Sequence, residues 1–260
     1  MKFAPLSRYG LLSVSGGDAR GFLHAQLTND IENLPPSRAA LAGWCSAKGR
    51  LLASFLVIPT AQGFLLQLSR DLVPAVVKRL SMFILRSKVK IADESDKWHQ
   101  FGVWGEGVSG LDVPRDALAV AEQGPVLAVR AGAARFLVLS QDPHPFAQAA
   151  PIAEDLWTLD EIRAGRPLIS AATQDQFVPQ MVNFDTLGAV NFQKGCYPGQ
   201  EIVARAQYRG QVKRRMKLLQ APPGIALRPG EKFEGGTVVD VAPAENGSAL
   251  LAVMPIEEAA

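Results

Sequence analysis

Cysteine is scarce in this chain of 260 residues, which contains only Cys45 and Cys196. Two thiols exclude a scaffold held together by several disulfides, and neither cysteine lies in a CxxC motif or at zinc-site spacing from histidines. An iron–sulfur cluster normally takes four protein thiolates, so we do not expect this chain to hold one alone. The sequence therefore predicts no metal site.

Long apolar runs are also missing. The longest, Leu51–Pro59, is far shorter than the roughly 20 residues that a membrane-spanning helix needs. The first ten residues lack the continuous apolar core of a signal peptide. We expect no membrane partner and a location in the reducing cytoplasm.

The net charge is low and histidines are few as well. The formal net charge of +2 is too small to favour nucleic-acid binding by the whole surface, so any polyanion contact must come from a local patch. One basic patch is present at 205–217. The three histidines, His24, His99 and His144, have no carboxylate or cysteine at ligand spacing, so we expect surface or core positions for them.

What the sequence does contain is an alternation of strand-like and helix-like segments over its first hundred residues. Apolar runs between glycine turns predict strands, and apolar residues at helical spacing predict helices. Predicted strands span Tyr9–Ser15, Ala39–Ser46, Arg50–Ile58 and Gly63–Leu68, and predicted helices start after Asp18 and span Leu72–Leu85. This order favours an α+β domain with helices on one face of an antiparallel sheet.

The remaining segments extend this pattern. A second α+β unit is predicted from about residue 100 to 146, and a helix at Ala153–Gly165 with Leu156, Leu159 and Ile162 along its buried side. From about Met216, short apolar runs alternate with glycine and proline turns. That pattern predicts a small β-structure, a barrel.

The stretch QKGCYPGQEIVARAQYRG at 193–210 contains the second cysteine. Pro198 and Gly210 bracket a predicted helix, because proline suits the first helical position and glycine the position past the end. Glu201 lies in the first turn and is expected to pair with Arg205. The predicted buried stripe is Ile202, Val203 and Ala206.

Cys196 lies just before this predicted helix, between Gly195 and Gly199. Unpaired N–H groups at a helix start, together with Lys194, favour a thiolate, so the pattern indicates a reactive or ligand-facing cysteine. The alternative is that Cys196 is a small buried hydrophobic residue, as free cysteines often are.

The octapeptide KGCYPGQE at 194–201, followed by VAR at 203–205 and YRG at 208–210, resembles the signature of the YgfZ family, the folate-binding relatives of the glycine cleavage T-protein. Other segments resemble the family in the same order along the chain. They are LHAQLTND at 23–30, CSAKGR at 45–50, FVPQ at 177–180 and LGAVNFQ at 187–193.

The resemblance implies a fold of ferredoxin-like, T-protein-like α+β subdomains and a C-terminal small β-barrel, arranged as a ring around a central hole that accepts tetrahydrofolate. Residues 1–202 would then form a folate-binding region of two α+β subdomains. Its break falls near 90–100, and 150–202 return to complete the site. Residues 203–260 would form the β-barrel domain.

The resemblance also implies a function: a folate-binding accessory protein that supports iron–sulfur cluster assembly or repair and thereby tRNA modification. Its partners would be iron–sulfur proteins or their assembly machinery. In this hypothesis Cys196 supplies a thiolate, Lys194 supports that charge, and Glu201 and Arg205 fix the loop.

Two aromatic residues, Tyr9 and Trp157, match positions known as folate contacts in the family. Aromatic stacking suits a flat pterin or aminobenzoyl ring; alternatively, Trp157 joins Leu156 in the core. The full set of implied folate-binding residues is Tyr9, Trp157, Gln180, Asn183, Tyr197, Gln200, Glu201, Arg205 and Arg209.

The chain departs from its relatives at several positions. T-proteins that transfer an aminomethyl group carry acidic residues where this chain has Leu51 and Leu52, so no general acid or base is found there. Many relatives have a glutamate where Met181 stands, which leaves Gln180, Asn183 or Asp185 to meet the donor-rich edge of a pterin.

Alternatives to the accessory function therefore stay open: a folate-dependent one-carbon (aminomethyl-type) transferase, or a non-enzymatic scaffold with a vestigial folate pocket. The basic patch at 205–217 also has several interpretations. It would attract RNA, an acidic partner protein or the polyglutamate tail of a folate, or it is an ordinary solvated surface.

Overall fold

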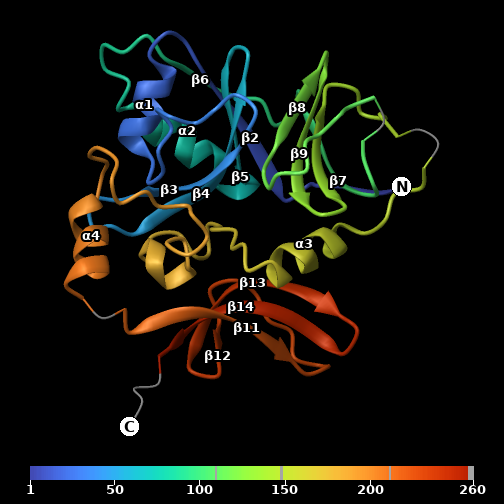
Figure 1. Cartoon of the computed structure of the whole chain (residues 1–260). Helices are drawn as coiled ribbons and strands as arrows, with labels where there is room; N and C mark the ends of the chain where they lie inside the picture. The colour runs from blue at the N-terminus through green and yellow to red at the C-terminus, as the bar shows by residue number, and fades with distance from the viewer. Residues whose placement is uncertain (109, 147–148, 211, 257–260) are drawn as a thin grey trace. The chain divides into compact units, whose positions relative to one another are not determined.

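The computed structural model describes residues 1–108, 110–146, 149–210 and 212–256 (Figure 1). Residues 211 and 257–260 of the predicted barrel domain lie outside the described part. The strands are β1 (Lys2–Pro5), β2 (Tyr9–Ser15), β3 (Ala40–Cys45), β4 (Leu51–Thr60), β5 (Gly63–Ser69), β6 (Lys90–Asp93), β7 (His99–Trp104), β8 (Val120–Gln123), β9 (Val126–Gly132), β10 (Arg135–Ser140), β11 (Arg214–Ala221), β12 (Lys232–Phe233), β13 (Gly236–Ala244) and β14 (Gly247–Pro255). The helices are α1 (Ala19–Gln26), α2 (Val73–Ser81), α3 (Glu154–Arg163) and α4 (Gln200–Tyr208), with short 3-10 helices η1 (Arg70–Leu72) and η2 (Pro179–Val182).

The chain divides into two compact units, each assembled from separate stretches of sequence. Unit 1 comprises Met1–Leu23, Ile31–Ala40 and Phe55–Trp157, and unit 2 comprises His24–Asp30, Leu41–Ser54 and Thr158–Ala260. The domain boundaries expected near 90–100 and at 202 stay predictions.

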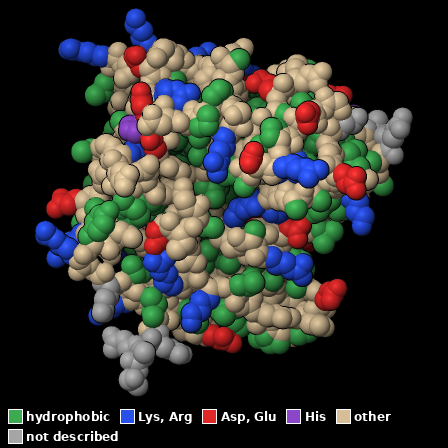
Figure 2. Space-filling view, in the orientation of Figure 1, with side chains coloured by type: hydrophobic (Ala, Val, Ile, Leu, Met, Phe, Trp, Pro, Cys, Tyr) green, Lys and Arg blue, Asp and Glu red, His purple; other side chains and the backbone are tan. Residues whose placement is uncertain are grey.

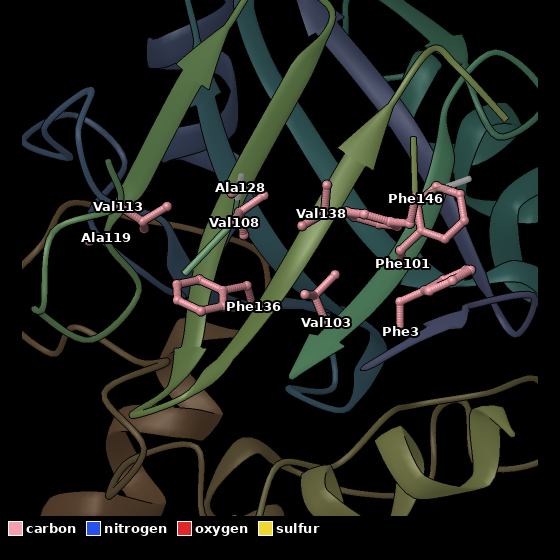
Figure 3. Close-up of a cluster of buried hydrophobic side chains, with 10 residues drawn as sticks. All are labelled: Phe3, Phe101, Val103, Val108, Val113, Ala119, Ala128, Phe136, Val138 and Phe146. Atoms are coloured by element: carbon pink, nitrogen blue, oxygen red, sulfur yellow. The ribbon is translucent and has the colours of Figure 1, made fainter. Parts of the chain in front are cut away.

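One sheet of unit 1 has the strand order β1-β7-β10-β9-β8, with every pair antiparallel. Side chains alternate between the two faces of a strand, so partners in register share a face. Val103 is the register partner of both Phe3 and Phe136, and Val138 is the partner of Phe101. These side chains form one buried cluster with Phe146 and smaller residues (Figure 3).

A second sheet has the order β3-β4-β5-β2-β6. Its strand β2 pairs with β5 from Tyr9 opposite Ser69 to Ser15 opposite Gly63. A Cβ atom on Gly10 would lie 2.2 Å from Cγ2 of Val73 at the start of α2. The glycine therefore lets the first turn of α2 pack directly on β2.

The C-terminal part of unit 2 is an antiparallel sheet with the order β11-β14-β13-β12 (orange to red in Figure 1). Ala221, Val238, Leu250 and Ala252 are buried together on it. The predicted C-terminal β-structure is confirmed as this four-stranded sheet, whereas its closure into a barrel stays a prediction.

Several predicted elements are confirmed closely, while others end earlier than expected. The strand at Tyr9–Ser15 has the predicted bounds, and β3, β4 and β5 differ from the predictions by one or two residues. The helix predicted to reach Leu85 ends at Ser81, because the apolar residues that follow face solvent; Leu85 is 90% exposed and has a positive φ of 45°.

Two other helices differ from the expected pattern. In α3, Leu159 and Ile162 are buried as predicted, but Leu156 is 46% exposed, so it does not belong to the buried side. Helix α4 starts at Gln200, with Gly199 as its N-cap, so Pro198 lies outside the helix. Val203 is buried as predicted, but Ile202 is 40% exposed, because the helix buries a narrower face than the sequence suggested.

None of the described helices has the length and hydrophobicity that a membrane-spanning segment requires.

Candidate functional site

The candidate site of unit 2 is the segment 191–199, here named the cysteine loop, which leads into α4. Its thiol, on Cys196, is exposed, so the alternative of a buried Cys196 is wrong. The other thiol differs sharply: Cys45, at the end of β3, is buried, and this burial, with a smaller effect from Asp175, raises its pKa to about 12. Of the two thiols, only that of Cys196 is available to a partner or ligand.

The first anchor of the cysteine loop is the segment that follows α1. The backbone N–H of Asn191 donates to the carbonyl oxygen of Thr28 at 2.9 Å. The Thr28 hydroxyl donates to the Ala189 carbonyl at 2.6 Å and accepts from the N–H of Gly43 at 2.7 Å. Thr28 therefore joins the start of the loop to β3 through buried hydrogen bonds, which are costly to break.

Within the loop, Asn191 holds the backbone in a turn. Its Oδ1 accepts hydrogen bonds from the N–H groups of Gln193 and Lys194, at 2.8 and 3.1 Å. Asparagine often stabilises turns in this way. This local bond sets the direction in which the Lys194 side chain leaves the loop.

The second anchor is Lys194, whose side chain is only 9% exposed. Its ammonium donates to the carbonyls of His24 and Leu27, the latter at 2.9 Å, at the C-terminal end of α1. The carbonyls at a helix C-terminus lack intrahelical partners and favour a cation. The ammonium also lies 4.9 Å from the ring centroid of Tyr197.

Burial lowers the pKa of Lys194 to about 8, while negative charge on Asp30 and Cys196 opposes that shift. The expected electrostatic role of Lys194 toward Cys196 stays a prediction. The hydrogen bonds add a structural role, because the same group fastens the loop to α1.

The third anchor is a contact between two glycines. A Cβ on Gly199 would lie 2.3 Å from the carbonyl oxygen of Ser46 and 2.6 Å from Cα of Gly49, and a Cβ on Gly49 would lie 2.8 Å from Cβ of Ile202. Both glycines have positive φ, 78° and 68°. The turn at 46–49 therefore packs on the backbone at the start of α4.

A pair that the sequence did not reveal lies beside the loop. Nδ1 of His24 is 3.2 Å from Oδ1 of Asp30, and a Cβ on Gly195 would lie 3.7 Å from Nε2 of His24. The expectation that His24 has no neighbouring carboxylate is wrong, because the chain turns back after α1 and returns Asp30 to the end of the helix.

The remaining predicted residues of the cysteine loop and α4 divide into buried and exposed sets. Tyr197 is buried, which raises the pKa of its hydroxyl, and Nε2 of Gln200 donates to the Lys194 carbonyl at 3.3 Å. Glu201, Arg205 and Arg209 are exposed, and no ion pair joins Glu201 to Arg205 in the described structure. The expectation that this pair fixes the loop is wrong, because Thr28, Lys194 and Gly199 hold it.

Gln180 and Asn183 lie around η2 and are held by unit 2 itself. Nε2 of Gln180 donates to the Val203 carbonyl at 2.7 Å, but no described residue donates to its buried Oε1. Nδ2 of Asn183 donates to the Met216 carbonyl at 2.9 Å. Of the two side chains, Gln180 retains a buried acceptor without a described donor, and Asn183 ties η2 to β11.

Asp185, the third residue expected near a pterin edge, is bound to another side chain. Its two carboxylate oxygens accept from Arg215 at 2.7 and 2.6 Å, and this hydrogen-bonded pairing raises the pKa of Arg215. A bidentate pair of this kind is among the stronger ion pairs in proteins. The arrangement gives Asp185 a structural role.

Tyr9 and Trp157 belong to unit 1. Trp157 is 3% exposed, with Arg135 Cζ 4.7 Å from its ring centroid, and a Cβ on Gly102 would lie 2.3 Å from its ring. This packing favours the interpretation of Trp157 as a core residue. Tyr9 is buried too, but it lines a cavity of about 720 Å³.

Acidic side chains lie among the cations of the predicted basic patch at 205–217. On the face shown in Figure 2, Lys and Arg side chains over α4 and the C-terminal sheet are interspersed with Asp and Glu. Within the patch, Arg215 is paired with Asp185, and the ring of Tyr208 packs edge-on against Phe192 with centroids 6.0 Å apart. These contacts favour an ordinary solvated surface.

No family model matches the chain. An uncharacterized protein from Haemophilus influenzae is 34% identical over 235 residues, which cover 90% of this chain and 78% of that protein. The tRNA-modifying protein YgfZ of Pectobacterium carotovorum is 31% identical over 269 residues, covering 93% of this chain and 80% of that protein. The protein of the same name from Edwardsiella ictaluri is 32% identical over 253 residues, with 88% and 76% covered.

Among solved structures, the glycine cleavage system aminomethyltransferase T of Bartonella henselae matches with a TM-score of 0.74, over 98% of this chain and 78% of that one. The sequence identity is 14%, so the likeness concerns the fold. It confirms the expected T-protein-like fold of mixed α and β structure, rich in sheets. The ring with a central hole stays a prediction.

Proposed function

The chain belongs to the YgfZ family, and on this premise we propose that it is a folate-binding accessory protein that supports iron–sulfur enzymes and, through them, tRNA modification. Its relatives carry the name tRNA-modifying protein YgfZ. The observation that carries the proposal is the exposed thiol of Cys196 on a loop that is held at three points. Because three anchors hold the loop that exposes this thiol, we infer that the thiol has a function.

The folate part of the proposal is supported by two separate observations, one within each unit. The cavity that Tyr9 lines in unit 1 has aromatic walls, which suit a flat ring system. In unit 2, the buried Oε1 of Gln180 lacks a described donor, and a pterin edge offers N–H donors. When bound, the folate would supply the capacity to carry a one-carbon unit.

The transferase alternative has less support from the fold. Leu51 and Leu52, which stand where aminomethyl-transferring relatives carry acidic residues, are both buried at the start of β4. A general acid or base would have to come from elsewhere.

The binding test is anaerobic calorimetry with tetrahydrofolate. We expect binding by the wild-type protein, at least tenfold weaker binding by Tyr9→Ala, and nearly normal binding by Tyr9→Phe, which keeps the ring. Gln180→Leu removes the free acceptor and is expected to weaken binding by about tenfold. Absence of binding by the well-folded wild-type protein would refute the folate part.

Trp157→Ala needs a stability measurement beside the titration. Removal of a buried tryptophan side chain costs about 3–5 kcal/mol, so lost binding in this variant has two explanations. Thermal denaturation of the same sample separates them. Trp157→Phe retains most of the packing, and unchanged binding by that variant would support the core interpretation.

The thiol part is tested in cells that lack the protein. We expect Cys196→Ala to fold normally and yet fail to restore methylthiolated tRNA, whereas Cys45→Ala restores it. Full restoration by Cys196→Ala would remove the thiol from the proposal while leaving folate binding untouched.

A further inference from the structure

A cavity of about 720 Å³ lies entirely among residues of unit 1. We name it the aromatic pocket. Its apolar wall includes Phe3 of β1, Phe101 of β7 and Phe146 of the segment after β10, and Figure 3 shows these three rings gathered together. The ring centroids lie 5.1 to 5.9 Å apart. The volume falls in the range of about 300–1,000 Å³ typical of small-molecule sites.

Three polar residues on the wall of the aromatic pocket are already used inside the protein. The Ser7 hydroxyl donates to Glu154 at 2.6 Å, and Oγ of Ser95 accepts from the N–H of Leu11 at 3.0 Å. Gln100 accepts from Gln67 through its Oε1. A ligand would have to displace these bonds in order to use those groups, so they are poor candidates for ligand recognition.

The imidazole rings of two histidines on the wall of the aromatic pocket differ from these polar groups. His99, at the start of β7, is half-buried, and His144, in the segment after β10, is exposed, and both line the aromatic pocket. Among the described residues, neither ring has a hydrogen-bond or ion-pair partner; the hydrogen bond of His144 uses its backbone N–H, which donates to Asp142. Two of the three histidines of the chain therefore face one cavity with their ring nitrogens unused.

A cation completes the polar side. Arg70 lines the same cavity, and its guanidinium donates to Asp96 at 2.6 Å. That pair is largely solvent-exposed, with 46% and 91% of the two side chains accessible. Exposed pairs contribute little to stability, so Arg70 remains able to interact with an anion at the pocket.

We propose that the aromatic pocket of unit 1 binds a planar aromatic ring that carries a carboxylate, with the ring against Phe3, Phe101 and Phe146 and the carboxylate facing His99, His144 and Arg70. The phenylalanine rings provide apolar surface and edge-to-face contacts for another ring. Imidazole and guanidinium N–H groups are the donors that a carboxylate requires. The inference rests on the proposed function in one respect, because the aminobenzoylglutamate part of a folate belongs to this ligand class.

The test is a titration of the full-length protein with p-aminobenzoyl-L-glutamate, observed by calorimetry. We expect saturable binding, and at least tenfold weaker binding by the double variant His99→Ala, His144→Ala and by Arg70→Gln. Arg86→Ala is the matched control, because Arg86 is an exposed cation that does not line the pocket. It should bind like the wild-type protein.

A second measurement needs no variant. The analogue in which amides replace both carboxylates of the probe should bind the wild-type protein at least tenfold more weakly. Failure of the wild-type protein to bind the acid, or equal affinity for acid and amide, would overturn the inference. Undiminished binding by the folded double histidine variant would do the same.

Free p-aminobenzoate and tetrahydrofolate distinguish the source of the ligand and separate this inference from the proposed function. Binding of p-aminobenzoate and of p-aminobenzoylglutamate without tetrahydrofolate would support the pocket as a site for a free aromatic acid and would count against folate. Tetrahydrofolate binding that is unaffected by the histidine and Arg70 variants would overturn the inference and leave the proposed function in place.

Discussion

The backbones of Gly49 and Gly199 lie in direct contact within unit 2, each in a left-handed conformation that a side chain would strain. Gly49 ends the turn after β3, and Gly199 is the N-cap of α4. The contact brings together two sequence segments that resemble the same family, and it sets where α4 starts. Neither glycine leaves room for a Cβ atom.

We expect Gly199→Ala to destabilise the protein by clearly more than Gly188→Ala. Both positions have positive φ, 78° and 67°, but a Cβ on Gly188 meets nothing within 4 Å. Gly188→Ala therefore reports the conformational strain alone, about 1–2 kcal/mol, and Gly199→Ala adds a steric clash. Chemical denaturation of the two variants measures the difference, and equal destabilisation would show that the backbone contact is dispensable.

Thiol labelling should distinguish the two cysteines. In the native protein, a thiol reagent such as DTNB should react with Cys196 and leave Cys45 unmodified, because only Cys196 is exposed. In denaturant both should react. Fast native labelling that persists in Cys196→Ser would contradict the burial of Cys45.

The buried thiol also predicts how stability depends on alkaline pH. The pKa of Cys45 is about 12 in the folded protein against 9.0 for an unperturbed thiol. Between pH 9 and pH 12 the unfolded chain releases this proton and the folded chain keeps it, so the free energy of unfolding falls as pH rises. Below pH 9 the Cys45 thiol is protonated in both the folded and the unfolded chain, so it does not change the free energy of unfolding.

We expect Cys45→Ala to show a shallower loss of stability between pH 9 and pH 11 than the wild-type protein. Denaturant titrations at several pH values measure the slope. Tyr197 acts in the same direction, since burial raises its pKa as well, so some slope should remain in the variant. Equal pH slopes of the free energy of unfolding in the wild-type protein and in Cys45→Ala would contradict the raised pKa of Cys45.

The ion pair between Asp185 and Arg215 should contribute measurably to stability. Asp185→Asn removes the charge from a side chain that is 8% exposed, and hydrogen bonds to charged groups contribute about 1.5–3 kcal/mol. We expect a destabilisation of that size in urea. Asp96→Asn, in the largely exposed pair with Arg70, is the control and should leave the urea midpoint unchanged.

Short sequence patterns correctly predicted the strands and turns whose formation depends mainly on neighbouring residues. Strand β2 has the predicted bounds because an apolar run ends at a glycine turn, and the turn between β3 and β4 has Gly49 at its left-handed position. The helix after Leu72 was predicted too long, because the apolar residues beyond Ser81 keep helical spacing although Met82 and Leu85 are 71% and 90% exposed.

The candidate site was only partly predictable, because its anchors join distant segments. The signature pointed to Cys196 and Lys194, but nothing local shows that Lys194 reaches the carbonyl of Leu27 or that Asn191 meets Thr28. The pair of His24 and Asp30 depends on where α1 ends. The pocket role of His99 and His144 had no local signal, because β7 and the segment after β10 meet only in the folded unit.

The hydrogen bond from Lys194 to Leu27 has a consequence for the order of events during synthesis. The two residues are 167 positions apart, so the ribosome must deliver most of the chain before the ammonium reaches the end of α1. Contacts of such long sequence separation form late. The loop that presents Cys196 therefore reaches its final geometry only when nearly the whole protein has been made, and a nascent chain carries no finished thiol site.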